Sequence, residues 1–181
     1  MKKYLVFLII LFTAGSAWAS DYRVELEMNY FNPSKQIFKD VYGSGVIYGI
    51  KAEKSNVFKK FGLIVETGYF QKRGKLTFTR EGTTVKIFYL GPGITYHYSK
   101  GIFDMYGGAG IRYYRFEERN PLGHTQQGKL GYFISLGSYV HLWKHFYADL
   151  AFNYSGCRVK PADLKVEIGG LEAGIGLAYK F

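Results

Sequence analysis

The chain has 181 residues, a length that suits one folded domain. It contains 17 Tyr, 15 Phe and 23 Gly but only 4 Pro, and its single cysteine, Cys157, excludes an internal disulfide framework. The formal net charge of +10 at pH 7 would suit a nucleic-acid partner, but the first residues predict export from the cytoplasm, so we expect none.

The first twenty residues are typical of an export signal. Two lysines precede an apolar run at 4–12, and Ala17 and Ala19 are the small residues of a cleavage site. The run is shorter than the about 20 residues that a transmembrane helix needs. We therefore expect residues 1–19 to be a cleaved signal peptide and residues 20–181 to be one β-barrel domain.

Alternation of apolar and polar side chains with a period of two then predicts extended strands along the chain. In the first strand, for example, Leu26 and Met28 share a face opposite Glu25 and Glu27. No apolar run after residue 20 is long enough for a membrane-spanning helix. The eight predicted strands, in chain order, cover residues 21–32, 44–54, 61–71, 83–98, 102–116, 129–142, 146–155 and 169–181.

Two predicted strands contain features that need an explanation. Pro92, in the fourth strand, cannot donate a hydrogen bond to a ladder, so we expect a local bulge there. In the fifth strand, the glycine-rich stretch 107–110 precedes no helix. It therefore favours packing inside a barrel over phosphate binding.

The connections between the predicted strands alternate in length. Those at 55–60, 99–101 and 143–145 are short. An outer-membrane barrel with both termini in the periplasm has short turns on that side and long loops outside. The other connections, which are long or extended and polar, lie at 33–43, 72–82, 117–128 and 156–168. This sorting favours a transmembrane barrel over a soluble sandwich.

The two faces of the predicted strands differ in composition. One is continuously apolar and carries aromatic residues near strand ends, as the membrane interfaces require. The other combines glycines with charged residues, which would be unusual on the exterior of a soluble, lipocalin-like barrel. We therefore expect the charged face to line the lumen.

An eight-stranded barrel has an interior just wide enough for side chains to fill. Charges in such a space are costly unless they are paired, so we expect Lys51 and Arg112 to bridge several carboxylates and close the lumen to continuous water. The predicted lumen charge network consists of Arg23, Glu25, Glu27, Lys51, Glu53, Glu66, Asp104, Arg112, Asp149, Glu172 and Lys180.

The export signal, the eight amphipathic strands and the closing LAYKF resemble the small outer-membrane barrels of Gram-negative bacteria, of the OmpX and OmpA transmembrane-domain type. The resemblance covers essentially the whole mature chain. It implies an all-β, eight-stranded antiparallel up-and-down transmembrane β-barrel in the outer membrane, with both termini in the periplasm. It also implies that Tyr179 and Phe181 are an assembly signal for the outer-membrane barrel-assembly machinery, although both could be interfacial aromatics alone.

Two enzyme families share this architecture. Lipid A deacylases of the PagL kind use a His-x-Ser pair on a late strand, where this chain has Asn153 and Ser155. Palmitoyltransferases of the PagP kind use a loop histidine with an Asp-Ser pair, and this chain has His124 but no Asp-Ser dipeptide. His141 and His145 have a spacing that forms a metal-binding face only on a helix. We therefore expect no enzyme activity, no cofactor and no metal.

These observations predict a non-enzymatic outer-membrane barrel with a side-chain-filled lumen, which contributes to envelope integrity or to surface interaction. A small-solute channel of the OmpW kind and a lipid A-modifying enzyme are the alternatives. Besides the assembly machinery, we expect outer-membrane lipids and lipopolysaccharide as partners, and a monomer. Phosphates of lipopolysaccharide would meet basic residues at the outer end, namely Lys72, Arg73, Lys75 and Arg80. The sequence names no ligand and no role for Cys157.

Overall fold

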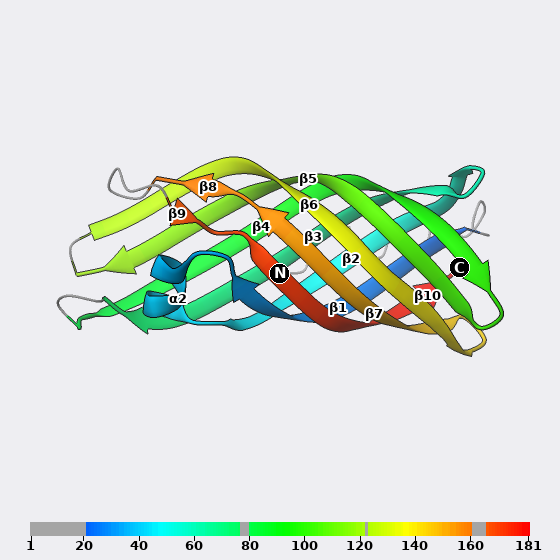
Figure 1. The fold of residues 1–181 in the computed structure, drawn as a ribbon, viewed down its shortest axis with the longest axis horizontal. Coiled ribbons are helices and arrows are strands. Elements are labelled where there is room, and N and C mark those ends of the chain that lie inside the picture. The colour runs from blue at the N-terminus through cyan, green and yellow to red at the C-terminus, as the bar shows by residue number, and fades with distance from the viewer. Residues whose placement is uncertain (1–20, 77–79, 122, 161–165) are drawn as a thin grey trace, which may run out of the picture.

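The computed structural model describes residues 21–76, 80–121, 123–160 and 166–181. Eight antiparallel strands form a closed barrel in the order β1, β10, β7, β6, β5, β4, β3, β2, which confirms the predicted up-and-down fold (Figure 1). The barrel strands are β1 (Tyr22–Pro33), β2 (Gly45–Phe58), β3 (Phe61–Lys75), β4 (Gly82–Lys100), β5 (Phe103–Asn120), β6 (Gly123–Trp143), β7 (Phe146–Gly156) and β10 (Gly170–Lys180).

The barrel has two different ends, which we call the turn end and the loop end. The turn end contains Tyr22, Lys180 and the short turns at 59–60, 101–102 and 144–145. Gly101 has φ +63°, a left-handed conformation that glycine adopts without strain. The loop end contains helix α2 (Gln36–Tyr42) and a small hairpin of β8 (Arg158–Val159) and β9 (Val166–Glu167) (Figure 1).

Side-chain exposure alternates along each barrel strand, and the registers place outward residues of neighbouring strands beside each other. Leu26 lies opposite Ile50 on β2 and Leu177 on β10, and all three point outward. Leu26 is 62% exposed, whereas the neighbouring Glu25 is 1% exposed. The outer wall is therefore an apolar belt around a polar interior, the arrangement that suits a barrel in hydrocarbon.

Exposed aromatic side chains border the apolar belt on both sides. Such residues occupy the interfaces of a membrane, where one end of the ring is apolar and the other is wet. The turn-end group contains Tyr22, Phe58, Phe61, Tyr96, Tyr98, Phe103, Trp143 and Tyr179, and the group nearer the loop end contains Tyr30, Tyr48, Tyr69, Phe88, Tyr113, Tyr132 and Tyr154. In the described residues, no helix has the length and apolar character to cross a membrane.

The predicted polar link at 33–43 contains helix α2, which the sequence interpretation missed. Phe38 and Tyr42 are four residues apart and form the buried face of the helix, with ring centroids 4.9 Å apart. Gly43, with φ +65°, ends the helix and donates its N–H to the carbonyl of Lys39 at 2.8 Å. Seven residues are too few to show a helical period, so the sequence pattern could not reveal this helix.

The stretch 117–128 was expected to be a loop, but most of it is strand. β5 continues to Asn120 and β6 begins at Gly123, and these two residues pair with each other. The ladder satisfies the backbone hydrogen bonds of both strands even though the side chains here are polar. β2 is also longer than expected and reaches Phe58.

The bulge expected at Pro92 was wrong. Pro92 lies opposite Val65 in an unbroken register with β3. On its other side, the ladder to β5 loses its pairs at 91–92 and resumes in the same register at Gly93 and Gly110. The missing N–H of proline therefore costs local pairing but causes no shift. Register shifts lie instead near the turn end, between Lys54 and Phe58 and between His141 and Trp143.

Candidate functional site in the barrel lumen

Charged side chains in the lumen form three layers, each built around one cation. In the layer nearest the turn end, Arg23 of β1 contacts Glu53 of β2 (Nη1 to Oε2, 3.2 Å) and Asp104 of β5 (Nη2 to Oδ2, 2.9 Å). Its guanidinium also lies 3.7 Å from the centroid of the Tyr139 ring, a cation–π contact. Because β1 and β5 are on opposite sides of the barrel, this layer crosses the lumen.

His97 of β4 completes the same layer. Its Nδ1 lies 3.2 Å from Asp104 Oδ1, and its Nε2 contacts Glu53 Oε1. Thr95 lies beside it, with Oγ1 3.3 Å from His97 Nε2, an order of hydroxyl, imidazole and carboxylate found in hydrolases. However, Thr95 is 3% exposed and donates its hydroxyl to Glu53 at 2.7 Å. The geometry therefore suits an ion network better than a nucleophile.

The middle layer is built around Lys51 of β2. Its Nζ lies 2.8 Å from Glu25 Oε2 on β1 and 3.0 Å from Asp149 Oδ2 on β7. Two tyrosines add hydrogen bonds: Tyr106 donates to Asp149 at 2.8 Å, and Tyr139 donates to Glu25 at 2.9 Å. Charge-assisted bonds of this kind offset much of the cost of burying the ions.

The third layer is built around Arg112 of β5, which is 0% exposed. Its Nε lies 2.6 Å from Glu66 Oε1 on β3, and its Nη1 lies 2.7 Å from Glu172 Oε1 on β10. The guanidinium is also 4.1 Å from the centroid of the Tyr89 ring. Ser155 donates a further hydrogen bond to Glu172 at 3.2 Å. One guanidinium therefore ties three strands across the lumen.

Two residues of the predicted network lie outside these bonds. Glu27 is 6% exposed, and among the described residues it has no ion pair and no partner for its Oε1. Lys180 is only half-buried and borders a recess of about 300 Å³ at the turn end, together with Arg23 and Asp104. The structure thus brings nine of the eleven residues into the three layers and leaves these two apart.

Lumen glycines leave room for the large side chains of neighbouring strands. A Cβ at Gly68 would lie 2.4 Å from Cζ of Tyr89, and one at Gly137 would lie 2.5 Å from Cζ of Tyr106. No real side chain tolerates such a contact without a shift of its neighbour. These glycines therefore allow the tyrosines to lie across the lumen beside Arg112 and Lys51.

The loop-end half of the lumen is apolar, which the sequence interpretation missed. Phe31 and Phe70 pack edge to face, with centroids 5.3 Å apart, and Phe38 of α2 packs on Phe70 at 6.5 Å. The inward parity of these strands continues to their loop ends, so the alternation itself could have identified them. We call this group the apolar plug; it consists of Phe31, Phe38, Tyr42, Ile47, Phe70, Val85, Ile87, Tyr89, Tyr114, Phe116, Cys157, Val159 and Ile168.

Hydrogen bonds hold α2 against the plug. The Tyr42 hydroxyl lies 2.9 Å from Thr83 Oγ1 and donates to Glu118 Oε1 at 2.8 Å. Burial, together with the Glu118 carboxylate, raises the pKa of the Tyr42 phenol above its usual value, so it remains a donor. Burial raises the pKa of the Cys157 thiol to about 12, so this cysteine is a packing residue rather than a nucleophile.

The histidines outside the lumen do not converge on one site. His124 is near the loop end, 3.3 Å from Glu117, and His141 is near the turn end, with Nε2 2.8 Å from the carbonyl of Lys144. In the described part of the chain, no three residues of the His, Cys, Asp and Glu types are placed to hold a metal ion.

The predicted assembly signal lies at the turn end, where Tyr179 belongs to the aromatic group. Tyr179 packs on Phe146 and Phe181, with ring centroids 5.2 and 4.9 Å apart. Phe181 donates its N–H to the carbonyl of Tyr22 at 2.9 Å, which joins the end of the chain to its first strand. The predicted cleavage residues, Ala17 and Ala19, lie outside the described residues.

Solved structures with the same fold come from several bacterial outer membranes. OprG from Pseudomonas aeruginosa has a TM-score of 0.69 at 16% identity, covering 90% of this chain and 97% of that one. Neisserial surface protein A has a TM-score of 0.65 at 14% identity, covering 90% and 99%. The E. coli outer membrane protein W has a TM-score of 0.53 at 13% identity, covering 90% and 98%. At these identities the likeness shows the fold.

A comparison with curated protein sequences found no match. By contrast, residues 5–181 match the family model described as the outer membrane protein beta-barrel domain. The match covers nearly the whole chain, and the closed antiparallel barrel with an apolar outer belt agrees with it. The chain therefore belongs to the outer membrane protein beta-barrel domain family, and its place is the outer membrane.

Proposed function

We propose that this protein is a non-enzymatic, monomeric outer-membrane barrel with a closed lumen, which contributes to envelope integrity and contacts lipopolysaccharide at its loop end. The observation that carries the proposal is the filling of the lumen along its length. Three ion layers occupy the turn-end half, and the apolar plug occupies the loop-end half. Among the described residues, almost all side chains of both halves are buried, and Thr95, the hydroxyl beside His97, is 3% exposed.

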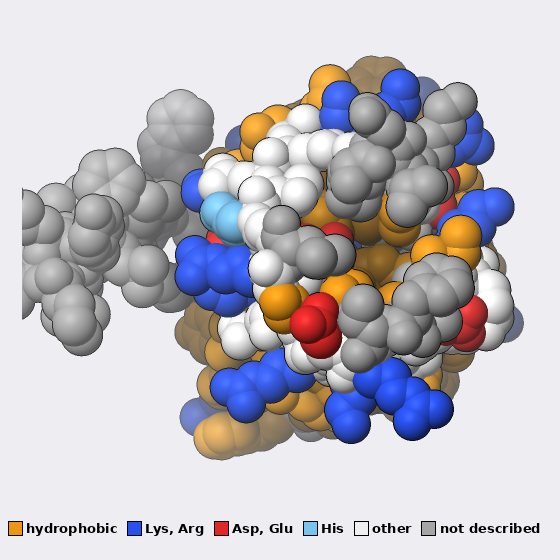
Figure 2. Space-filling view, turned by 90° about the vertical axis from the view of Figure 1, so that its left-hand side faces the viewer, with side chains coloured by type: hydrophobic (Ala, Val, Ile, Leu, Met, Phe, Trp, Pro, Cys, Tyr) orange, Lys and Arg blue, Asp and Glu red, His pale blue; other side chains and the backbone are white. Residues whose placement is uncertain are grey.

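We also propose an orientation of the barrel in the outer membrane. Short turns at one end and longer structures at the other support periplasmic termini, with the loop end outside. A signal peptide at residues 1–19 would deliver the chain to that side. Basic residues support the contact with lipopolysaccharide, because blue Lys and Arg side chains surround the rim of the loop end in Figure 2. We propose that the phosphates of lipopolysaccharide bind there.

Tyr179 and Phe181 are proposed as the signal that the barrel-assembly machinery recognises. Deletion of Phe181 should lower the amount of folded barrel in the outer membrane, measured by heat-modifiable gel mobility after envelope fractionation. The control is Phe58→Leu, which removes an exposed aromatic side chain from the same end of the barrel. Deletion of Phe58 is less suitable because it would alter a turn. Equal levels of folded barrel in all three proteins would refute the assembly signal.

Single-channel recording tests the closed lumen. Purified wild-type monomers in a planar bilayer should give no steady current. Ohmic conductance would overturn the proposal in favour of the alternative, a small-solute channel of the OmpW kind. A change in lipid A acylation on incubation with purified lipopolysaccharide would instead favour an enzyme. Loss of the gene should sensitise cells to detergent if the barrel supports the envelope.

A further inference from the structure

The wall of the barrel is higher on one side of the loop end than on the other. β3, β4, β5 and β6 have 15, 19, 18 and 21 residues, whereas β1, β7 and β10 have 12, 11 and 11. The four longer strands extend past α2 at the loop end (Figure 1). We call this extension the tall wall; it consists of residues 71–75, 82–86, 115–120 and 123–128.

The outer face of the tall wall is basic. Its outward positions are identified by their neighbours, because Val85 and Phe116 point into the apolar plug and Glu118 bonds Tyr42 of α2. The register places Arg73, Thr84 and Arg119 in one row and Lys86 opposite Glu117 in the next. We call the outward cations the basic patch; they are Arg73, Lys75, Lys86, Arg115 and Arg119.

Few carboxylates neutralise this patch. Among the described residues on the outer face of β3, β4 and β5, one side chain is acidic, that of Glu117. Its Oε1 lies 2.8 Å from Arg119 Nε. The side of the barrel with the shorter strands differs. The outward positions beyond Tyr30 on β1 and Tyr154 on β7 are Asn32 and Gly156, which carry no charge. On the strands themselves, the patch is therefore a property of this face, apart from the other cations around the rim (Figure 2).

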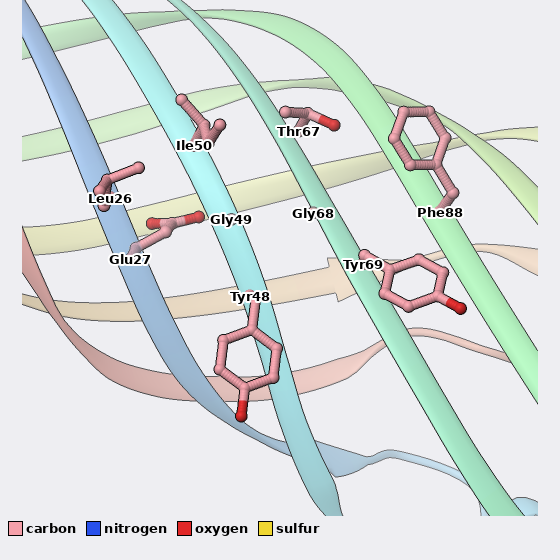
Figure 3. Close-up of a pocket in the computed structure, with 9 residues that line it drawn as sticks. All are labelled: Leu26, Glu27, Tyr48, Gly49, Ile50, Thr67, Gly68, Tyr69 and Phe88. Atoms are coloured by element: carbon pink, nitrogen blue, oxygen red, sulfur yellow. The ribbon is translucent and has the colours of Figure 1, made fainter. Parts of the chain in front are cut away.

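An apolar groove lies on the outer wall next to the patch. It has a volume of about 490 Å³, and Figure 3 shows Leu26, Ile50 and Thr67 along one side. Along the other side, toward the loop end, lie Tyr48, Tyr69 and Phe88, with Gly49 and Gly68 between the two rows.

The floor of this groove is thin but closed. On the lumen side, Glu27 lies against Gly49, with Oε1 2.5 Å from where a Cβ would be, and Tyr89 covers Gly68 in the same way. The groove therefore opens only to the hydrocarbon around the barrel. Its lining is almost entirely apolar, as a bound acyl chain requires.

The groove and the patch adjoin each other. Phe88, which borders the groove, lies opposite Arg115 on β5, and Lys86 follows it on the same face, two residues toward the loop end. Two residues along a strand span about 7 Å. A single amphiphile could therefore place an acyl chain in the groove and a phosphate between Lys86 and Arg115.

We propose that this face is a docking site for lipid A, the phosphorylated glycolipid anchor of lipopolysaccharide. One acyl chain occupies the groove, and the phosphates bind the basic patch through charge-assisted hydrogen bonds. Five cations against one carboxylate match a lipid with two phosphates better than a phospholipid with one. The proposal rests on the orientation given above, with the loop end in the outer leaflet, and deepens it by naming the face and the lipid.

The test measures binding of purified lipid A to the refolded full chain in detergent. The variant Lys86→Gln with Arg115→Gln should bind about tenfold more weakly, because it removes the two cations next to the groove. The matched control, Lys35→Gln with Lys39→Gln, removes two cations from α2 and its N-cap, away from the patch, and should bind as the wild type does. Thr67→Phe, which fills the groove, should also weaken binding, whereas Leu136→Phe elsewhere in the belt should not.

Three lipids separate the possible ligands. Lipid A should bind more tightly than its monophosphoryl form, and phosphatidylglycerol should bind most weakly. If the wild type, the patch variant and the groove variant bind lipid A equally, this site is wrong. The proposed contact with lipopolysaccharide would then lie elsewhere on the rim. Absence of lipid A binding by the folded wild type would overturn the proposed contact as well. Equal affinity for phosphatidylglycerol would show a general anionic-lipid surface and refute the assignment to lipid A.

Discussion

Glu27 is a buried carboxylate that, among the described residues, has no bonded cation in the lumen. Its neighbours in register are Gly49 and Gly176, which offer no side chain, and the nearby Glu66 and Glu172 repel it. Lys51 and Arg112 are each already bonded to two other carboxylates. A buried carboxylate without a bonded cation costs free energy, so the lumen network is not at its stability optimum here.

Neutralising Glu27 should therefore stabilise the barrel. We expect Glu27→Gln to raise the free energy of unfolding by about 1 kcal/mol, because the amide keeps the shape and loses the charge. The matched variant Glu66→Gln should lower it by about 2 kcal/mol, because Arg112 loses a charged partner. Urea titration of the protein refolded in lipid vesicles measures both values. A lower stability for Glu27→Gln would mean that the carboxylate is held by a favourable partner.

Strand parity predicted which residues point into the lumen but not which of them would bond. Arg23 and Lys180 have the same parity and are paired in register, yet Arg23 is buried between two carboxylates while Lys180 stays half-exposed. Partners across the lumen depend on barrel stagger and side-chain reach, which alternation does not encode. For the same reason His97, Tyr106 and Tyr139 were not recognised as members of the network.

At the scale of elements, the sequence pattern was informative wherever a strand crosses the apolar belt. One face must meet lipid there, so alternation is strict, and the predicted strands agree with the observed ones. Beyond the belt both faces of a strand can be wet. Beyond Phe116, the loop-end parts of β5 and β6 carry polar residues or glycine on both faces and were interpreted as a loop, although their ladder continues to Asn120 and Gly123.

A charge on the outer face tests the strand faces and their depth. Ile175 is 57% exposed and lies between Met28 and Leu150 in the belt, so Ile175→Arg should lower the free energy of unfolding by about 2–4 kcal/mol. Leu142 is equally exposed but lies at the turn end, where Leu142→Arg should cost at most about 1 kcal/mol. Urea titration in vesicles compares them. Equal costs would contradict the placement of the belt.

Considered as a whole, the molecule has two closures in series along one axis. The ion layers around Arg23, Lys51 and Arg112 fill the lumen from the turn end to its middle. The apolar plug, which α2 covers, fills the rest. The first closure depends on paired charge and the second on packed aromatic rings, and the two meet where Tyr89 of the plug lies on Arg112.

Arg112→Ala should therefore destabilise the barrel without making it conduct. The variant leaves Glu66 and Glu172 without their shared cation, which should lower the free energy of unfolding by about 3 kcal/mol or more. The layers around Arg23 and Lys51 still separate the turn end from the space that Arg112 leaves, and the apolar plug still closes the loop end. Phe70→Ala with Phe116→Ala should likewise stay closed, because the Arg112 layer remains intact.

The combined variant, Arg112→Ala with Phe70→Ala and Phe116→Ala, removes the deepest ion layer and two rings of the plug together, so it weakens both closures and should give steady single-channel currents. All three proteins are compared in planar bilayers after selection of the folded fraction by heat-modifiable gel mobility, since the combined variant will fold less well. A current from Arg112→Ala alone would mean that the plug does not seal the loop end. Silence of the folded combined variant would mean that the remaining layers around Arg23 and Lys51 suffice to close the lumen.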